Sequence, residues 1–353
     1  MARPDIAVVG GGIVGRLLAW RAARQGLRVA LYEAGSSLGE ESAAWVAAGM
    51  IAPASEAIET SPKVAFMGQC SLTLWRDWLP QLPGTVFFRD TGTLLLWHGE
   101  NASEARRVET ILAARQAEVQ FRRLDGAQLR CLEPVLDGTF PQGLHLAGDA
   151  QVDNRELLKA IAIALEESNV QCHWYTFIAD LGRPDAEVVV DCRGMGARDA
   201  WPHLRGVRGE IVRLYAPDIQ LHHMLRLLHP RYAVYVVPRP AGMFVVGATS
   251  IESNDRSEVS VRGALELLSG AYSLLPALAE ARIREFATQV RPALPDNLPA
   301  LRYERDQRVL RINGLYRHGF LLAPALVEQA LSMLSALPSE SRDERTSALC
   351  MSS

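Results

Sequence analysis

A β-α-β unit with a glycine-rich turn opens the chain and constrains its fold more than any other feature. Residues 6–9 predict a short buried strand, residues 13–25 have helical spacing and end at a glycine, and residues 28–33 predict a second strand. Strand, helix and strand within about 30 residues are typical of a parallel, doubly wound sheet. The length of 353 residues leaves room for a second domain.

The turn itself predicts a dinucleotide site. Gly10-Gly11-Gly12-Ile13-Val14-Gly15 has the pattern G-x-G-x-x-G between the strand and the helix. Its glycines let backbone N–H groups approach a pyrophosphate, whose charge the helix N-terminus stabilises. Glu33 ends the second strand, where an acid accepts hydrogen bonds from a ribose and disfavours NADP. The alternative is a tight glycine turn with a surface glutamate, and the strand, loop, helix and acid together favour the dinucleotide.

The rest of the chain predicts a second, different sheet. Residues 94–97 and 233–237 have strand patterns, and the latter pairs with 243–249 across a Pro/Gly turn as a hairpin. Residues 261–275 predict a helix, whereas 188–190 and 309–312 are apolar strands followed by glycines, typical of the first domain. We predict a discontinuous nucleotide domain over 1–85, 140–208 and 288–338. An α+β substrate domain with a mixed, largely antiparallel sheet is inserted over 86–139 and 209–287, and 339–353 form a flexible polar tail.

Composition excludes several function classes. Only Lys63 and Lys159 stand against 35 arginines, and neither lies in a P-loop or Schiff-base context. The formal net charge of −3 argues against a nucleic-acid partner. With so many arginines, the 33 other than Arg291 and Arg317 are expected to be solvated surface charge.

Cysteine and histidine patterns predict a soluble cytoplasmic protein without a metal site. The five cysteines are scattered and form no C-x-x-C pair, as in reduced intracellular chains. The histidines lack metal-ligand spacing, and no apolar run reaches the roughly 18–20 residues that cross a membrane.

Three further segments are candidates for a binding site. Residues 42–53 are rich in small residues and end in Gly49-Met50-Ile51-Ala52-Pro53, so a planar group could lie against their backbone, although a packed core helix would have the same composition. Arg291 precedes a proline, which favours extended backbone, and could equally be an exposed loop arginine. Residues 313–324 predict a strand end, a polar cluster and a helix starting near Gly319, whose N-terminus could face a developing negative charge.

Taken in this order, the four segments resemble the D-amino-acid oxidase family of flavoproteins, most of all its bacterial glycine oxidases of thiamine biosynthesis. The resemblance spans residues 4 to 335. Its more specific parts are AAGMIAP at 47–53, RDTGTLLL at 89–96, YVVPR at 235–239 leading into VVGAT at 245–249, RPALPD at 291–296 and YRHGFLLAP at 316–324.

The resemblance implies a glutathione-reductase-type Rossmann domain that holds FAD without a covalent link. Arg291 and Arg317 would hold a substrate carboxylate, with Tyr235 and Ser250 beside it. A guanidinium matches a carboxylate bidentately, which a lysine cannot do. The implied FAD-binding residues are Gly10, Gly12, Ile13, Val14, Gly15, Glu33, Ala34, Ala43, Ala44, Ala48, Gly49, Met50, Phe177, Gly194, Leu315, Tyr316, His318, Gly319, Phe320 and Leu321.

Three positions depart from the family pattern. The family commonly has Gly-His-aromatic-Arg-Asn-Gly where this chain has 314–319 as Gly-Leu-Tyr-Arg-His-Gly. Ser250 stands where glycine oxidase can carry a methionine, and Asp191-Cys192-Arg193 replaces small apolar residues before Gly194. These departures leave the side-chain pocket, and hence the choice between glycine and a larger amine, open.

The implied reaction is FAD-dependent oxidative deamination of a small amino acid: glycine, sarcosine or a small D-amino acid. Hydride transfer from Cα to flavin N5 gives an imino acid, which hydrolyses or enters thiazole synthesis. Dioxygen is the expected electron acceptor and yields hydrogen peroxide; no residue is assigned as a general base. Two alternatives are an FAD dehydrogenase of another amine with a different acceptor, and a flavin-binding redox sensor without turnover. A homo-oligomer is left open.

Overall fold

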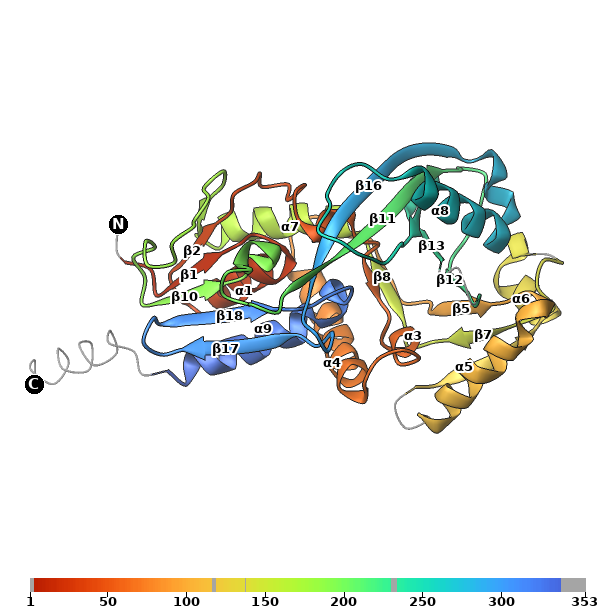
Figure 1. Cartoon of the computed structure of the whole chain (residues 1–353), viewed down its shortest axis with the longest axis horizontal. Helices are drawn as coiled ribbons and strands as arrows, with labels where there is room; N and C mark the ends of the chain where they lie inside the picture. The colour runs from red at the N-terminus through yellow and green to blue at the C-terminus, as the bar shows by residue number, and fades with distance from the viewer. Residues whose placement is uncertain (1–2, 116–118, 137, 230–233, 338–353) are drawn as a thin grey trace, which may run out of the picture.

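Two large sheets lie side by side along the long axis of the protein (Figure 1). The computed structural model describes residues 3–115, 119–136, 138–229 and 234–337, so the predicted tail lies outside the described residues. The first sheet has six strands in the order β17 (Ala300–Glu304), β18 (Val309–Asn313), β10 (Val188–Asp191), β1 (Ile6–Val9), β2 (Val29–Tyr32) and β9 (Gln171–His173). All neighbours are parallel except β17 and β18.

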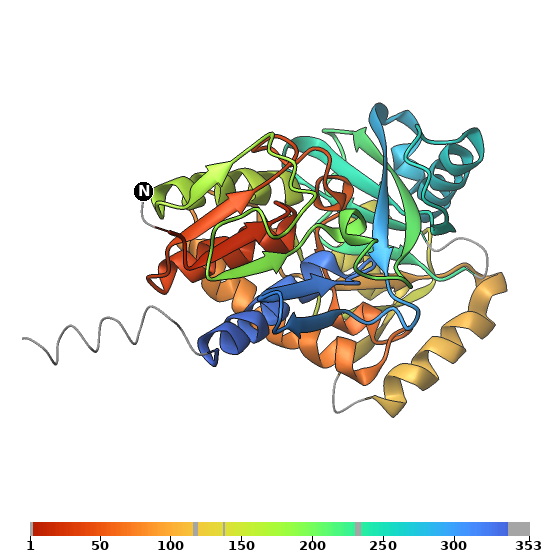
Figure 2. The same cartoon turned by 60° about the vertical axis from the view of Figure 1, so that its left-hand side comes forward.

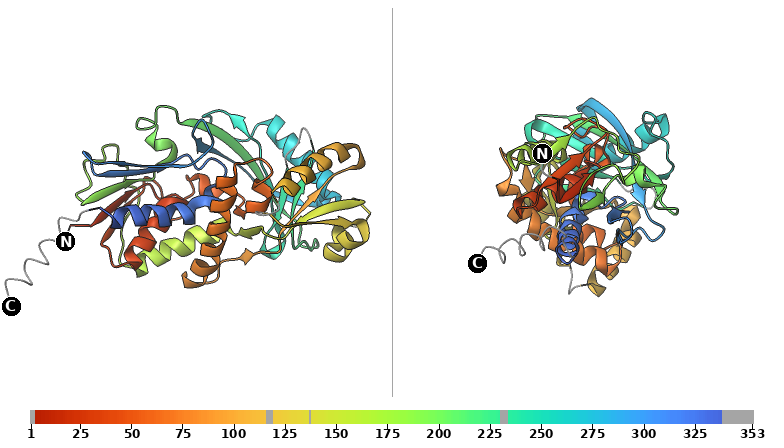
Figure 3. Two further views of the ribbon diagram at one scale, coloured as in Figure 1. Left: turned by 90° about the horizontal axis from the view of Figure 1, so that it is seen from below. Right: turned by 90° about the vertical axis from the view of Figure 1, so that its left-hand side faces the viewer.

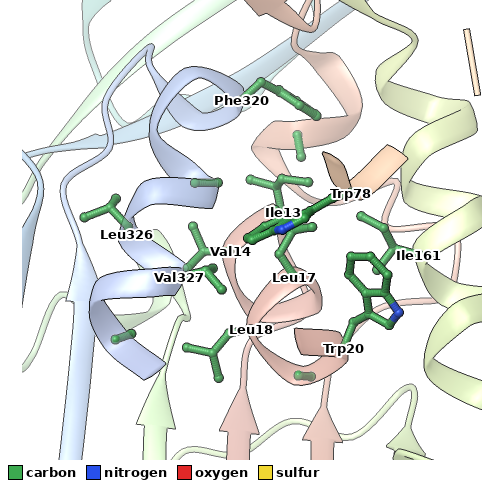
Figure 4. Packing of buried hydrophobic residues seen from close by; sticks show 14 of the residues in the cluster. Ile13, Val14, Leu17, Leu18, Trp20, Trp78, Ile161, Phe320, Leu326 and Val327 are labelled. Atoms are coloured by element: carbon green, nitrogen blue, oxygen red, sulfur yellow. The ribbon is translucent and has the colours of Figure 1, made fainter. Parts of the chain in front are cut away.

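The opening β-α-β unit is confirmed, with α1 at Ile13–Arg24 between β1 and β2. Seen from below, α7 (Asn154–Glu167) and α9 (Gly319–Ser335) run along this side of the sheet (Figure 3, left), and both contact α1. Leu17 and Leu18 of α1 are fully buried, and the packing of α1 against α9 includes Val327 (Figure 4). Burying this apolar stripe stabilises the layer by about 1.5–3 kcal/mol for each large side chain.

The second sheet is mixed and largely antiparallel. Its order is β15 (Ile251–Glu252), β11 (Arg205–Tyr215), β14 (Met243–Gly247), β13 (Tyr235–Pro238), β12 (Met224–Leu227), β5 (Thr93–Leu96), β7 (Gln142–Leu146) and β6 (Phe121–Asp125), with β16 (Arg282–Ala293) paired to β11. Only the β12–β5 pair is parallel. The hairpin of β13 and β14 confirms the predicted pairing, although residue 233 lies outside the described residues. The long strands β11 and β16 extend from this sheet toward the first one (Figure 2).

Smaller elements complete the fold. A three-stranded sheet joins β3 (Met50–Ile51), β8 (Ala150–Val152) and β4 (Phe88–Arg89). The remaining α-helices are α2 (Ala43–Val46), α3 (Pro53–Glu56), α4 (Pro62–Trp78), α5 (Ala102–Ala114), α6 (Gly126–Leu132) and α8 (Val261–Leu274). The fold class is therefore the predicted one, an α/β nucleotide-binding sheet with an inserted mixed sheet. The domain division stays a proposal, and sheet membership favours moving its boundaries, because β7 and the start of β11 belong to the second sheet.

The expectation that the arginines other than Arg291 and Arg317 are solvated is wrong at several positions. Arg16, Arg208, Arg213, Arg239 and Arg311 are all less than 10% exposed. Arg16 of α1 donates to the carbonyl oxygens of Gly11 at 2.6 Å, Ser37 at 2.7 Å and Leu158 at 3.2 Å, and burial lowers its pKa to about 10. These bonds replace the water that a buried guanidinium loses. Within the described ranges, no helix is both long and apolar enough to cross a membrane.

Candidate active site

A cavity of about 510 Å³ lies where the two sheets meet. Its lining comes from the carboxyl ends of β1, β2 and β10, from α2 and its following turn, from β11, β13 and β16, and from the N-terminus of α9. In open α/β sheets, ligands bind outside the carboxyl ends of the strands. The cavity therefore lies where the glycine-rich turn predicts a nucleotide.

The glycine-rich turn can only be built with glycine at two positions. Gly10 has a φ of +104°, and a Cβ there would lie 2.6 Å from the carbonyl oxygen of Cys192. A Cβ on Gly15 would lie 1.9 Å from the carbonyl oxygen of Gly10. Gly12 is the N-cap of α1 and no side chain caps the helix, while a Cβ on Gly12 would meet nothing within 4 Å. The open turn and the uncapped N–H groups fit a pyrophosphate.

Glu33 is held at the end of β2 by backbone donors. Its carboxylate accepts hydrogen bonds from the backbone N–H of Gly11 and, at 2.8 Å, from that of Gly35. It lines the cavity together with Ala34 and with Phe177, a residue that is 72% exposed. An acid next to an exposed ring fits the ribose and adenine of a dinucleotide.

The segment between α2 and β3 is a close backbone approach that buried side chains hold in place. Gly49 has a φ of +63°, and a Cβ there would lie 2.1 Å from the carbonyl oxygen of Val152. Arg239, whose side chain is 1% exposed, donates through Nη2 to the carbonyl oxygens of Ala48 and Val152, the latter at 2.9 Å. Asn154 Nδ2 donates to the carbonyl oxygen of Ala44 at 2.8 Å. The small residues that the sequence singled out therefore face the cavity with their backbone fixed from behind.

The N-terminus of α9 closes the other side of the cavity. Tyr316 has a φ of +51° and its N–H donates to the carbonyl oxygen of Pro292 at 2.8 Å, which joins this loop to β16. Ser250 Oγ and Tyr316 Oη lie 3.2 Å apart. His318 is the N-cap, and burial lowers its pKa, so the imidazole is neutral at neutral pH. The positive end of this 17-residue helix therefore faces the cavity without a charged cap.

Arg291 is a half-buried cavity guanidinium that pairs with no carboxylate in the part of the chain that the structure describes. It lies on β16 opposite Val207 of β11, and its Nη2 would be 2.2 Å from a Cβ on Gly209. Its Nη1 donates to the carbonyl oxygen of Thr249 at 3.1 Å, and no ion pair to it forms within the described part of the chain. Burial lowers its pKa, yet arginine stays charged over the physiological range. Tyr235 lines the same cavity, and burial raises the pKa of its phenol.

Arg317 lines the cavity too, but two glutamates already pair with it. Nη2 lies 2.8 Å from Glu56 Oε2 and 2.7 Å from Glu59 Oε2, and Nε lies 3.1 Å from Glu56 Oε2. Glu59 also pairs with Arg226, whose Nη1 donates to the carbonyl oxygen of Ser55 at 3.2 Å. Burial alone would lower the pKa of Arg317, but the two glutamates together raise it. Burial alone would raise the pKa of Glu56, but the surrounding cations lower it to about 2. A carboxylate-binding role for Arg317 stays a prediction, and Arg291 is the better placed of the two.

Glu56, Glu59, Arg226 and Arg239 were missed by the sequence reasoning. Glu56 follows the AAGMIAP motif by three residues, and Arg239 ends the YVVPR segment, so both lay next to predicted features. No spacing pattern marks Arg226, which comes from β12.

Comparison with known proteins identifies the family of the chain. The model of the FAD dependent oxidoreductase family matches residues 5–330. The chain belongs to this family. It is 38% identical over 331 residues to a Rhizobium etli protein that bears the name thiamine biosynthesis oxidoreductase ThiO, covering 93% of this chain and 96% of that protein. It is 28% identical over 347 residues to glycine oxidase of Geobacillus kaustophilus, covering 91% and 90% of the two chains. The crystal structure of that glycine oxidase superposes with a TM-score of 0.83 at 26% identity, over 96% of each chain.

FAD is therefore the cofactor of this oxidoreductase, and the cavity is its candidate site. The substrate-site predictions Arg291, Arg317, Tyr235 and Ser250 all line it, while Gly15 supports the turn from behind. That each lining residue contacts the flavin stays a prediction. The predicted cofactor residues in the lining are Gly10, Gly12, Ile13, Val14, Glu33, Ala34, Ala43, Ala44, Ala48, Gly49, Met50, Phe177, Gly194, Leu315, Tyr316, His318, Gly319, Phe320 and Leu321.

Proposed function

We propose that this flavoprotein oxidises glycine, with sarcosine and small D-amino acids as further substrates. When bound, the FAD supplies the oxidised ring that accepts a hydride from the substrate Cα, and the amino acid becomes an imino acid. Dioxygen is the proposed acceptor of the electrons, with hydrogen peroxide as its product. The names of the relatives, glycine oxidase and ThiO, support this substrate class and a role in thiazole formation for thiamine.

Arg291 is the observation that carries the proposal. A half-buried guanidinium whose one hydrogen bond within the described part of the chain goes to a backbone carbonyl has donors to spare and a charge that no carboxylate pairs with. The carboxylate of an amino acid satisfies both, and can do so bidentately. Because Arg291 and the small-residue segment at Gly49 line the same cavity, a substrate anchored there lies beside the place that the flavin ring is expected to take.

The neighbouring groups orient such a substrate rather than remove its protons. Burial raises the pKa of Tyr235, so its phenol stays protonated and can donate to the same carboxylate. The hydroxyl groups of Ser250 and Tyr316 lie within hydrogen-bond distance of each other and line the cavity next to this site. Holding a substrate at a fixed geometry supplies a large part of the rate enhancement when the cofactor carries the redox chemistry.

The test is a substrate panel under two atmospheres. Purified protein with FAD is mixed without oxygen with glycine, sarcosine, D-alanine and D-proline, and the flavin absorbance is followed. Bleaching by glycine, with recovery and peroxide formation on adding air, is the expected result.

The other outcomes select the alternatives. Bleaching without recovery in air would contradict the oxidase proposal and point to a dehydrogenase with another acceptor. Bleaching by none of the four would contradict amino-acid oxidation itself and favour a flavin-binding sensor.

A further inference from the structure

One carboxylate oxygen on a cavity-lining residue accepts no hydrogen bond from the described residues. Glu56 ends α3 and lines the cavity, and its Oε2 accepts both hydrogen bonds from Arg317. Oε1 accepts no hydrogen bond from any residue that the structure describes, and it is not among the buried unsatisfied atoms. Oε1 is therefore accessible to solvent, on a residue that lines the cavity. The side chain of Glu56 is 19% exposed.

The charges on either side keep Glu56 ionised without using this oxygen. The surrounding cations bring the pKa of Glu56 down to about 2, despite its burial. Burial lowers the pKa of Arg291, and the negative charge of Glu56 is one of the effects that raise it again. The cavity thus holds an anion with a free oxygen and a cation with free donors.

We propose that Glu56 is the receptor for the substrate amine, so that Arg291 and Glu56 bind the two ends of an amino acid. This inference rests on the proposed function and deepens it. A ligand with a carboxylate and an amine on adjacent atoms satisfies both groups, whereas a plain carboxylic acid satisfies only Arg291.

Glu56 also favours the reaction. As the Cα–H bond breaks and its electron pair leaves as hydride to the oxidised flavin, the nitrogen lone pair forms the C=N bond. The nitrogen then carries a positive charge that the neutral amine did not have. A fixed carboxylate stabilises the positively charged nitrogen more than it stabilises the neutral amine. It therefore lowers the barrier of the reaction and does not only tighten the binding of the substrate.

Glu59 is the matched control. It pairs with the same Arg317 and with Arg226, but it does not line the cavity. If Glu56 served only to neutralise Arg317, replacing either glutamate would have similar consequences for ligands. If Glu56 contacts the amine, only its replacement changes the preference for an amine.

The experiment compares Glu56→Gln and Glu59→Gln with the wild-type holoenzyme, using glycine and propionate. Propionate has the size of glycine, with a methyl group in place of the amine. Its Kd is measured from the perturbation of the flavin spectrum, and the Kd of glycine from the concentration dependence of anaerobic bleaching. FAD content and thermal unfolding check that each variant is folded.

We expect Glu56→Gln to raise the Kd of glycine about 10-fold or more, since a charge-assisted hydrogen bond is lost. The Kd of propionate should stay the same or fall. Glu59→Gln keeps the wild-type ratio of the two Kd values. An unchanged ratio in Glu56→Gln would overturn the proposal, as would wild-type protein that binds propionate as tightly as glycine. If Glu56→Gln does not fold, Glu56→Asp replaces it, because the shorter side chain keeps the charge beside Arg317 but withdraws the oxygen. This variant must still show a higher Kd for glycine without a higher Kd for propionate.

Failure of this inference is distinguishable from failure of the proposed function. Glycine that bleaches the wild-type flavin with no selective effect of Glu56→Gln refutes the amine receptor alone. A wild-type flavin that no amino acid of the panel bleaches refutes the proposed function.

Discussion

Replacing Arg291 with alanine removes a half-buried cavity cation that forms no ion pair with the described residues. Its Nη1 donates to the carbonyl oxygen of Thr249, so other donors of the guanidinium remain for a ligand. A hydrogen bond between charged groups contributes about 1.5–3 kcal/mol, which corresponds to a loss of about 10- to 150-fold in carboxylate affinity. We expect the Kd of propionate and the KM of glycine to rise by this factor.

The assay combines spectral titration with propionate and peroxide-coupled turnover of glycine, with FAD content as the check on folding. Arg302→Ala is the control, because Arg302 pairs with Glu304 on β17 and does not line the cavity. Arg291→Lys should recover part of the affinity, since a lysine keeps the charge but not the bidentate geometry. A rise of less than twofold in the alanine variant, with FAD retained, would refute the assignment of Arg291 as the carboxylate receptor.

Three further predictions follow from glycine packing and from a buried acid. Gly209→Ala places a Cβ 2.2 Å from Nη2 of Arg291 and should weaken propionate on the order of tenfold while FAD content stays normal, as read by the same titration. Gly15→Ala places a Cβ 1.9 Å from the carbonyl oxygen of Gly10 and should yield protein with little bound FAD, measured as the ratio of flavin to protein absorbance. Burial raises the pKa of Asp149 from 3.8 to about 6, so the folded protein retains a proton between these values that the unfolded chain releases. The protonated Asp149 therefore contributes about 3 kcal/mol to the free energy of unfolding below this range, and the contribution is lost as the pH rises through it. Asp149→Asn has no such proton. Relative to this variant, the wild type should therefore be more stable at about pH 4 than at about pH 7. A difference that does not change with pH would contradict this reasoning.

The parts of the fold that the sequence predicts correctly are those specified by neighbouring residues. The glycine turn, its flanking strand and helix, and the hairpin of β13 and β14 all depend on signals within about 30 residues. The limits of α1 and α8 differ from the prediction by one residue at their ends. The domain boundaries stay a proposal. The sheet to which the short strand β7 belongs is decided by its pairing with β5 and β6 rather than by its own pattern, so the sequence could not place it.

The ion pairs of the cavity could not be predicted in the same way. Arg317 is 261 residues from Glu56 in the chain, and Arg226 is 167 residues from Glu59. The family resemblance implied that Arg317 faces the site, and it does line the cavity. Which carboxylates come close to it depends on how α3 and α9 pack, and no local periodicity encodes this.

Two loops that border the cavity explain part of the excess of arginine over lysine. Arg16 holds three carbonyl oxygens around the glycine-rich turn, and Arg239 holds those of Ala48 and Val152 behind Gly49. A guanidinium offers five donors in a rigid fork, whereas a lysine offers a point charge on a flexible stem. Several carbonyl oxygens from separate segments can therefore share one arginine in a dry interior, which a lysine could not satisfy as well.

The same geometry accounts for the charge left in the cavity. In the network around α3, the positive charges of Arg226 and Arg317 are matched by Glu56 and Glu59, and Arg291 remains unmatched. One unmatched cation fits one carboxylate. Under the proposals made above, a site arranged in this way would bind a monocarboxylate, and the free oxygen of Glu56 would select the second functional group of the ligand.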